Sequence, residues 1–324
     1  MEIFRDLFAV KLTHPTVLTI GTFDGLHLGH QYLIKQVTDS AANRQARSAV
    51  IAFHPRPKTV LAPHLPNNDY LTTPEERIDL FRVLAIDALI LIPFTLAFAQ
   101  TTADDFMKLL VDRLNLVELW AGHDFALGKN REGNIQKLTV LGRDLGYSVQ
   151  EFEPLLIDGE IISSTRIRQL ITAGDVRRAA CLLGRYPALR STVVRGAQRG
   201  HTLGFPTANL SVSPERLLPT NGVYATFATL HRNHKRYPGV TNIGIRPSFG
   251  GDARTVETHI FDFEQNIYDE TVTLEFVEHL RPEKKFNGID ELVAQITKDA
   301  TQARSLLGDE APQPETGNDQ KGDT

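Results

Sequence analysis

The apolar pattern of this chain changes once, near residue 184, and that change limits the folds open to it. Before it, short apolar runs such as Val17–Ile20 and Ala88–Ile92 alternate with stretches of helical spacing such as Ala103–Leu114. Near-continuous apolar strands that alternate with helices are typical of a parallel sheet covered on both faces. After it, strand-like segments follow one another with no convincing helix between them, which predicts an antiparallel sheet or a small barrel.

These periods place the expected elements along the chain. In the first part we expect strands at 17–20, 49–53, 88–92, 117–121 and 147–152, with helices at 30–37, 74–84, 103–114, 135–145, 164–171 and 176–183. In the second part we expect strands at 191–195, 223–230, 237–245, 255–263 and 271–276, with a closing helix at 289–307. The predicted fold is therefore a Rossmann-like α/β domain with a parallel sheet, followed by an all-β barrel domain with a C-terminal helix.

The length of the chain agrees with two domains. Its 324 residues are enough for two hydrophobic cores. We expect the first domain at 1–185 and the second at 186–307. Residues 308–324 contain no large apolar side chain, so we expect them to form a disordered tail.

The composition excludes several classes of protein. With 35 Lys and Arg against 39 Asp and Glu, the net charge of −4 argues against a general nucleic-acid binder. No apolar run approaches the length of a membrane span. The single cysteine, Cys181, excludes a disulfide framework and a clustered-cysteine metal site, and its place on an apolar helix face indicates a small hydrophobic residue. We expect a cytoplasmic protein with no nucleic-acid or membrane partner.

A loop rich in glycine and histidine, residues 21–30, follows the first apolar strand and runs into a helix. Glycine lets a backbone approach phosphate closely, and a helix N-terminus presents free N–H groups to an anion. His27 and His30 flank Gly29, so their imidazoles are placed to donate hydrogen bonds to a transferring phosphoryl group. The alternative is a turn whose histidines only cap the helix.

A second segment supports the phosphate interpretation. Three hydroxyl side chains, at 163–165, precede a predicted helix whose first turns carry Arg166 and Arg168. Hydroxyls and guanidinium groups suit phosphate oxygens. An N-cap explains one hydroxyl well, but it explains three hydroxyls and two arginines poorly.

Residues 21–30 together with 162–168 resemble the H-x-G-H nucleotidyltransferases. Segments 94–98 and 122–128 resemble, more narrowly, the adenylyltransferase half of bacterial bifunctional riboflavin kinase/FAD synthetases. This resemblance implies that the two histidines contact the ATP phosphates, that Asp124 helps to hold the nucleotide and the flavin, and that the arginine at 168 binds phosphate. The full set assigned to this site is Gly21, Phe23, Asp24, His27, Gly29, His30, Asp124, Ser163, Ser164, Thr165 and Arg168.

A second glycine-rich segment, residues 195–210, follows the first strand of the barrel half. Its glycines permit a loop that wraps phosphates with its backbone, and Thr207 and Asn209 offer the oxygen ligands that Mg²⁺ prefers. Turn chemistry after Pro206 explains those two residues about equally well. The candidate residues of the segment are Gly196, Arg199, Gly200, Gly204, Thr207 and Asn209.

Glu257 lies within an otherwise apolar strand-like segment. We expect its carboxylate to project into the barrel mouth, where it could orient or deprotonate a hydroxyl nucleophile. Phosphoryl transfer otherwise needs mainly positioning and charge neutralisation. Taken alone, the position is explained better by a solvent-facing residue on a half-exposed strand.

Segments 195–210, 222–225, 241–244 and 256–259 resemble the riboflavin kinase module, in that order. The resemblance implies that Thr207 and Asn209 bind Mg²⁺ with ATP, and that Glu257 is the base for the ribityl 5′-hydroxyl. The implied function is phosphorylation of riboflavin by ATP to FMN, followed by adenylyl transfer from ATP to FMN, which gives FAD and pyrophosphate. The alternatives are an enzyme with one of the two activities or a flavin-binding regulator; the oligomeric state stays open.

Two segments depart from the family pattern. The family commonly has F-x-P-H-P after its second strand, whereas Phe53–Pro57 carries His54 and Arg56 with the two residue types exchanged. The usual L-Y-G near the end of the barrel is Ile267–Asp269 here. Loss of that glycine reduces the freedom of a turn, so flavin contacts of both segments stay open.

Overall fold

The computed structural model describes residues 1–64, 69–196, 200, 203–248 and 251–308. The candidate residue Arg199 and the predicted tail from 309 onward lie outside the described residues. The chain divides into two compact units. The first unit comprises Met1–Ala173, Arg178–Arg185 and Ser213–Leu218, and the second comprises Gly174–Arg177, Tyr186–Val212 and Pro219–Thr324.

The first unit is built on a six-stranded sheet in the order β1-β4-β3-β2-β5-β8, and every pairing in it is parallel. The strands are β1 (Glu2–Phe4), β2 (Thr16–Gly21), β3 (Arg47–Phe53), β4 (Ala88–Ile92), β5 (Leu116–Gly122) and β8 (Ser148–Phe152). The predicted parallel α/β fold is therefore confirmed.

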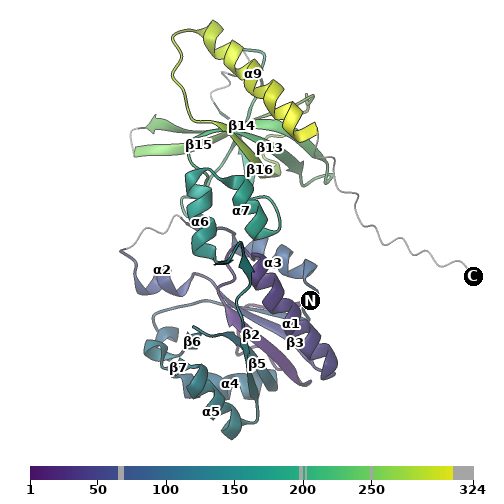
Figure 1. Ribbon diagram of the computed structural model, residues 1–324, viewed down its shortest axis with the longest axis vertical. Coiled ribbons are helices and arrows are strands. Elements are labelled where there is room, and N and C mark those ends of the chain that lie inside the picture. The colour runs from purple at the N-terminus through teal and green to yellow at the C-terminus, as the bar shows by residue number, and fades with distance from the viewer. Residues whose placement is uncertain (65–68, 197–199, 201–202, 249–250, 309–324) are drawn as a thin grey trace, which may run out of the picture. The chain divides into compact units, whose positions relative to one another are not determined.

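Helices cover both faces of this sheet (Figure 1). The covering helices are α1 (Leu28–Asn43), α3 (Pro74–Val83), α4 (Ala103–Leu114) and α5 (Ile135–Leu145). Helices α1 and α3 share one apolar cluster with side chains such as Val50, whereas α4 and α5 share another with side chains such as Ile51. Neighbouring residues of one strand thus point to opposite cores, which explains why the strands read as continuous apolar runs.

The strand order fixes where a ligand can bind. The chain passes from β2 to β3 and β4 on one side of the sheet, and then crosses to β5 and β8 on the other. Ligands of open α/β sheets bind outside the carboxyl ends of the strands at such a switch point. The segments that follow β2 and β5 are the glycine–histidine loop and the residues around Asp124.

Two further helices of the first unit were expected, α6 (Ser164–Ala173) and α7 (Val176–Leu183), and they pack in a third apolar cluster with Ile162. Several short elements were not expected. They are α2 (Pro57–Leu61), β6 (Ala126–Leu127), β7 (Gly133–Asn134), β9 (Leu156–Ile157) and β10 (Glu160–Ile161), together with β1. Strands of two or three residues and a single helical turn such as α2 carry no measurable period, so pattern alone misses them.

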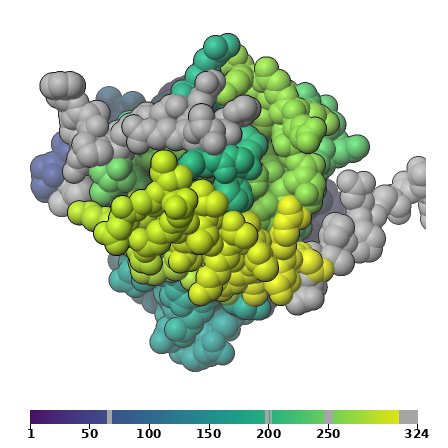
Figure 2. All heavy atoms as spheres, turned by 90° about the horizontal axis from the view of Figure 1, so that it is seen from above, coloured from purple at the N-terminus to yellow at the C-terminus, as the bar shows by residue number. Residues whose placement is uncertain are grey.

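The second unit is a closed antiparallel barrel in the order β11-β12-β15-β14-β13-β16, which settles the choice between an open sheet and a barrel. Its strands are β11 (Ala188–Val194), β12 (Ala208–Leu210), β13 (Gly222–Leu230), β14 (Arg236–Ser248), β15 (Gly251–Ile260) and β16 (Thr271–Arg281). The sequence predicted five strands and missed β12, which has three residues and follows Pro206 closely. Helix α9 (Ile289–Gly308) packs on β13 and β14, and its atoms form the yellow surface in Figure 2.

Two sequence expectations bear on the surface of the molecule. Within the described part of the chain, none of the helices is long and apolar enough to cross a membrane. Cys181, expected as a small hydrophobic residue of an apolar helix face, is exposed. On α7 the neighbours Leu182 and Leu183 take the buried positions, and a helix cannot bury three consecutive residues against one surface.

Candidate functional sites

The loop that joins β2 to α1 has an unusual backbone. Phe23 and Leu26 have left-handed φ values of 48° and 40°, a region that non-glycine residues rarely adopt, and Gly25 has φ of 82°. A Cβ at Gly25 would lie 2.7 Å from the Leu71 side chain. Such a backbone persists only where its surroundings hold it in place, and it is common at functional sites.

Asp24 anchors this loop through its buried side chain, which is 1% exposed. Its carboxylate accepts hydrogen bonds from the backbone N–H groups of Leu71 and Thr72 and from the Thr72 hydroxyl, at 3.0–3.2 Å. It is also paired with the guanidinium groups of Arg56 and Arg168. The residue was expected to bind ATP or phosphate, but its carboxylate faces the protein and orients other groups.

Two arginines share two aspartates beside this anchor. Arg168 donates from Nε to the Asp69 carbonyl at 2.8 Å and pairs with the carboxylates of Asp24 and Asp69. Arg56 pairs with the same two carboxylates, and its guanidinium lies 4.0 Å from the centre of the Tyr70 ring. Arg56, which occupies the departure from the family pattern, is thus a 7% exposed part of this ion cluster.

The three predicted hydroxyl residues have different surroundings. Ser163 Oγ accepts the N–H of Arg166 at 3.3 Å and so caps the start of α6. Ser164 Oγ donates to the backbone carbonyl of Asp24 at 2.8 Å and connects α6 to the loop. Thr165 is exposed. The cap explanation therefore accounts for one hydroxyl, as expected, and a contact with the loop accounts for a second.

His27 and His30 stack on each other at the N-terminus of α1. Their ring centres are 3.6 Å apart at an angle of 18°, and the Phe23 ring lies edge-on to His30 at 5.1 Å. His27 is the N-cap of α1, and its Nδ1 accepts the N–H of His30 at 3.3 Å. Because Nδ1 is an acceptor, a neutral His27 carries its proton on Nε2, where it can be donated.

Both histidines are held in the neutral form. Burial, together with the charges of Arg185 and Arg168 and against the opposing effect of Asp24, lowers the pKa of His27 to about 4. Burial lowers the pKa of His30 well below its usual value, with the next contribution from His27. At neutral pH the pair therefore offers N–H donors without a net charge.

The remaining residues of the first site shape it. A Cβ at Gly21 would lie 3.0 Å from the Phe23 ring, and one at Gly29 would lie 3.2 Å from Nδ1 of His27. Both glycines therefore make room for neighbouring rings. Asp124 is exposed just after β5, on the other side of the switch point, and its carbonyl accepts a hydrogen bond from Arg131 at 2.9 Å.

The second site is organised by strand register. Asn209 of β12 is the direct partner of Glu257 of β15, which is in turn the partner of Asn242 of β14. Directly opposed residues project from the same face of a sheet, so the three polar side chains form a row. We call Asn209, Glu257 and Asn242 the polar row.

The polar row faces outward. The adjacent row inside the barrel consists of Thr226, Thr241 and Thr258, which are buried and joined by hydroxyl contacts of 2.8 and 2.7 Å. Because successive residues of a strand point to opposite faces, Glu257 projects away from the barrel interior. The expectation that its carboxylate enters the barrel mouth is therefore wrong.

A cavity of about 310 Å³ lies on this outer face beneath α9. Its walls come from the strands, from residues after β16 and from α9. They include Gly200, Thr207, Asn242, Glu257, His259, Arg281, Lys284, Leu292 and Ile296. The volume is that of a small ligand site, and the walls combine apolar side chains with a few polar groups.

Two cations of this cavity were missed by the sequence analysis. Arg281 donates from Nε and Nη2 to the carboxylate of Asp299 at 2.7–3.0 Å, and Asp299 is 3% exposed on α9. Lys284 pairs with Glu291 at 2.9 Å. The local sequence does not indicate that Arg281 and Lys284 belong to this site, because both are more than 20 positions from Glu257. They line the cavity only when α9 packs on the barrel.

The glycine-rich segment lies close to the polar row. A Cβ at Gly196 would overlap the side chain of Asn209, and one at Gly200 would overlap the Phe205 carbonyl. Phe205 N–H donates to the Gly200 carbonyl at 2.9 Å, which closes a turn before Thr207. Gly204 is exposed with φ of 83°.

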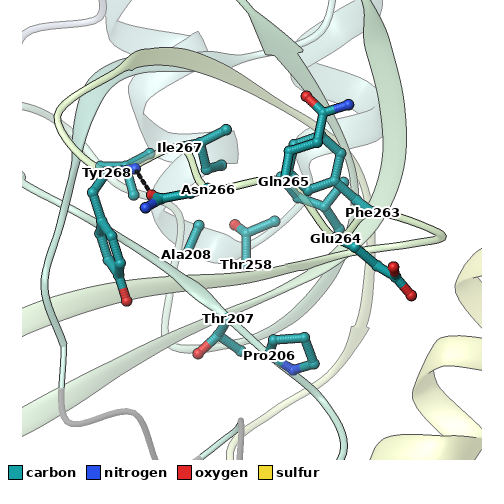
Figure 3. A pocket seen from close by; sticks show the side chains of 12 residues that line it. Pro206, Thr207, Ala208, Thr258, Phe263, Glu264, Gln265, Asn266, Ile267 and Tyr268 are labelled. Carbon is teal, nitrogen blue, oxygen red and sulfur yellow. Dashed lines mark hydrogen bonds between the residues drawn. The ribbon is translucent and has the colours of Figure 1, made fainter.

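Figure 3 shows a second cavity in the same unit, of about 440 Å³. The loop at 263–268 faces Ala208 and Thr258, and Thr207 lines both cavities. The second departure from the family pattern thus forms part of a cavity wall. Asp269 replaces the usual glycine with φ of 64°, a conformation that aspartate tolerates better than most residues.

Comparisons with known proteins agree with this division. Residues 10–166 match the family model described as FAD synthetase, and residues 183–307 match that described as riboflavin kinase. The bifunctional riboflavin kinase/FMN adenylyltransferase of Listeria monocytogenes is 36% identical over 297 residues, which cover 90% of this chain and 92% of that protein. The protein of the same name from Haemophilus influenzae is 34% identical over 310 residues, which cover 95% and 99%.

A solved structure has the same fold over nearly the whole chain. The crystal structure described as a macrolide-efflux protein from Streptococcus pneumoniae has a TM-score of 0.86 and 31% sequence identity. The match covers 93% of this chain and 98% of that one.

Proposed function

We propose, since this chain belongs to the family of bifunctional riboflavin kinase/FMN adenylyltransferases, that each of its two units performs one of the two reactions at the site described above. The second unit phosphorylates riboflavin with ATP to give FMN. The first unit transfers AMP from a second ATP to FMN, which gives FAD and pyrophosphate.

In the adenylyl-transfer site of the first unit, the phosphate of FMN attacks the α-phosphorus of ATP in line as pyrophosphate leaves. The attacking group is already an anion, so no side-chain nucleophile and no covalent enzyme intermediate are needed. His27 donates from Nε2 to the phosphoryl oxygens, where negative charge develops, and His30 supports it from the adjacent stacked ring. Asp24 orients Arg168, which exchanges an aspartate for a phosphate when ATP binds.

In the second site, Glu257 accepts the proton of the ribityl 5′-hydroxyl as that oxygen attacks the γ-phosphorus of ATP, and ADP leaves with the bridging oxygen. Thr207 and Asn209 are uncharged oxygen donors next to this carboxylate, and they suit Mg²⁺, which keeps several of its waters. A bound Mg²⁺ would neutralise charge on the ATP phosphates. Among the described residues no cluster of three or more His, Cys, Asp or Glu suits a metal ion, so such an ion would depend on ATP for further ligands.

One observation carries the proposal of two reactions: each polar site is built wholly from residues of its own unit. The stacked histidines, Asp24 and Arg168 belong to the first unit, and the polar row belongs to the second. We place the functional boundary between residues 185 and 186. Cytoplasmic location is part of the same proposal, because a chain with a single cysteine suits a reducing compartment.

Chromatography of flavins after incubation of the purified protein with riboflavin, ATP and Mg²⁺ tests the proposal. We expect FMN to form first and FAD to follow. Omission of Mg²⁺ with added chelator should stop both reactions. FMN that does not proceed to FAD would limit the protein to the kinase activity. Unchanged riboflavin, with binding retained, would favour a flavin-binding regulator instead.

A further inference from the structure

Arg185 follows the turn that ends α7, and this turn sends its side chain back toward the first site. Gly184 has a left-handed φ of 71°, and its N–H donates to the Ala180 carbonyl at 2.9 Å. A Cβ at Gly184 would lie 2.6 Å from the Leu28 side chain at the start of α1. The close approach of α7 to α1 therefore requires glycine here and places Arg185 beside the loop.

The Arg185 guanidinium binds three backbone carbonyls. It donates to the carbonyl of Gly25, and from Nη1 to those of Leu26 and Leu183 at 3.3 Å each. Gln31 of α1 donates to the same carbonyls of Leu26 and Leu183, at 2.9 and 3.0 Å. Two side chains thus join the C-terminal end of α7 to the loop that leads into His27.

This loop needs support from outside. Phe23 and Leu26 hold left-handed backbone conformations that are unfavourable on their own. Asp24 fixes the first part of the loop through its side chain. On the C-terminal side, Arg185 and Gln31 bind the carbonyls that immediately precede His27.

Arg185 also contributes charge. Burial is the largest cause of the low pKa of His27, and the cation of Arg185 is the next. The other charged groups that act on His27 are Asp24, which raises its pKa, and Arg168, which lowers it. One guanidinium therefore restrains the backbone before His27 and disfavours protonation of its ring.

We propose that Arg185 is a positioning residue of the adenylyl-transfer site, which holds the carbonyls of Gly25 and Leu26 so that the ring of His27 presents its Nε2–H to the reacting phosphate. The inference rests on the proposed function of this site. Arg185 itself contacts the loop and donates its hydrogen bonds to backbone, so its effect on the reaction passes through His27.

Replacement of Arg185 by methionine in the full chain tests the proposal. We expect kcat for FAD formation from supplied FMN to fall about 10²-fold, as is typical when a reacting group is misplaced. The kcat for riboflavin phosphorylation should stay unchanged and report an intact second unit, while the transition of the first unit in calorimetry reports whether that unit is folded in the same sample. The pKa of His27, followed by NMR of labelled histidine, should rise above about 4, because the second-largest cause of its low value is removed while burial remains.

Arg185→Lys separates charge from geometry. Lysine keeps the cation but lacks the planar fork of donors, so the pKa of His27 should stay low while kcat recovers only in part. A merely structural role would not separate the two measurements. Arg143→Met, at an exposed arginine of α5, is the matched control and should leave both activities and the pKa of His27 unchanged.

Adenylyl transfer by Arg185→Met within twofold of the wild-type kcat would overturn the proposal, as would an equal loss of both activities. If Arg185→Met does not fold, a wild-type kcat for FAD formation in Arg185→Lys would overturn the proposal instead. A wild-type protein that makes no FAD from FMN would refute the proposed function instead. In that case an unchanged pKa of His27 in Arg185→Met would still refute the contact argued here.

Discussion

The two sites of this protein are built in opposite ways. The proposed adenylyl-transfer site consists of buried groups that are bound to one another, with Asp24 engaged by five donors from residues far along the chain. The proposed kinase site consists of a polar row on regular strands, in which Asn242 is exposed and the other two residues are half-buried, next to cavities of about 310 and 440 Å³. The site of the first unit holds its hydrogen-bond donors in one fixed orientation. The site of the second unit is more open, so its side chains become fully ordered only when ligands bind.

The difference predicts different sensitivities. Loss of a buried group in the first site leaves its partners unpaired and distorts the loop, so stability and activity should change together. Loss of a group in the second site removes chemistry while the barrel stays folded. The following predictions, in order of expected size, test this contrast.

Glu257→Gln should have the largest effect. It keeps the size of the side chain but removes the general base, and we expect kcat for FMN formation to fall about 10³-fold. FAD formation from supplied FMN and the melting temperature should not change, because the residue belongs to the other unit and makes no buried pair with any residue that the structure describes. Glu278→Gln, which removes a surface ion pair with Arg177, is the matched control.

A fall of FAD formation in Glu257→Gln by more than about twofold would show that the two sites are not independent, contrary to the contrast drawn above.

Acid should destabilise the first unit next most strongly. The pKa of His27 is about 4 in the folded protein against 6.5 in the unfolded chain, so the unfolded state binds more protons between these values. The stabilisation is complete above pH 6.5 and is lost as the pH falls toward 4; it amounts to about 3 kcal/mol for this residue. Urea unfolding of wild type and His27→Asn over this range measures it.

The expected result is a steeper loss of stability with falling pH in the wild type than in His27→Asn. Equal pH dependence in the two proteins would contradict a buried, neutral His27.

His27→Asn should also lower adenylyl transfer by about 10²-fold at neutral pH, as loss of one donor to a developing oxyanion does. Asparagine can replace Nδ1 as the cap of α1, but it has no group at the place of Nε2. The reduction should therefore appear in kcat with little change in helix content by circular dichroism. His14→Asn, at an exposed histidine, serves as the control.

Riboflavin phosphorylation unaltered in His27→Asn would support separate sites. Retention of full adenylyl transfer would remove His27 from the reaction.

Thr102→Ala should have the smallest effect. Thr102 caps α4 by accepting the N–H of Asp105 at 3.1 Å, and loss of such a cap costs about 1 kcal/mol. For a unit of this size that lowers the melting temperature by about 2–4 °C. Calorimetry should show the shift in the transition of the first unit alone, and Thr102→Ser should restore it. Displacement of both transitions together would show that the units unfold as one.

Much of the fold follows from local pattern. The bounds of β4, α4, α5 and α7 agree with their expected ranges, because each element combines a full apolar period with clear ends such as Asn134, which caps α5, and Gly146, which ends it. The loop at 21–30 and the serines before α6 were identifiable because their residue types occur together within a few positions. The composition and motifs thus predicted two domains and two phosphate-handling sites.

Only the tertiary structure decided which groups meet. Glu257 faces outward because register with β14 and β12 pairs it with two asparagines, and no local pattern distinguishes the two faces of a closed barrel. Arg185 lies 160 positions from Gly25, and Arg168 lies 144 from Asp24, yet these pairs form the first site. Periodicity reports on neighbours within a helix or a strand, whereas burial of charge and support of a strained loop depend on contacts that arise when distant segments pack.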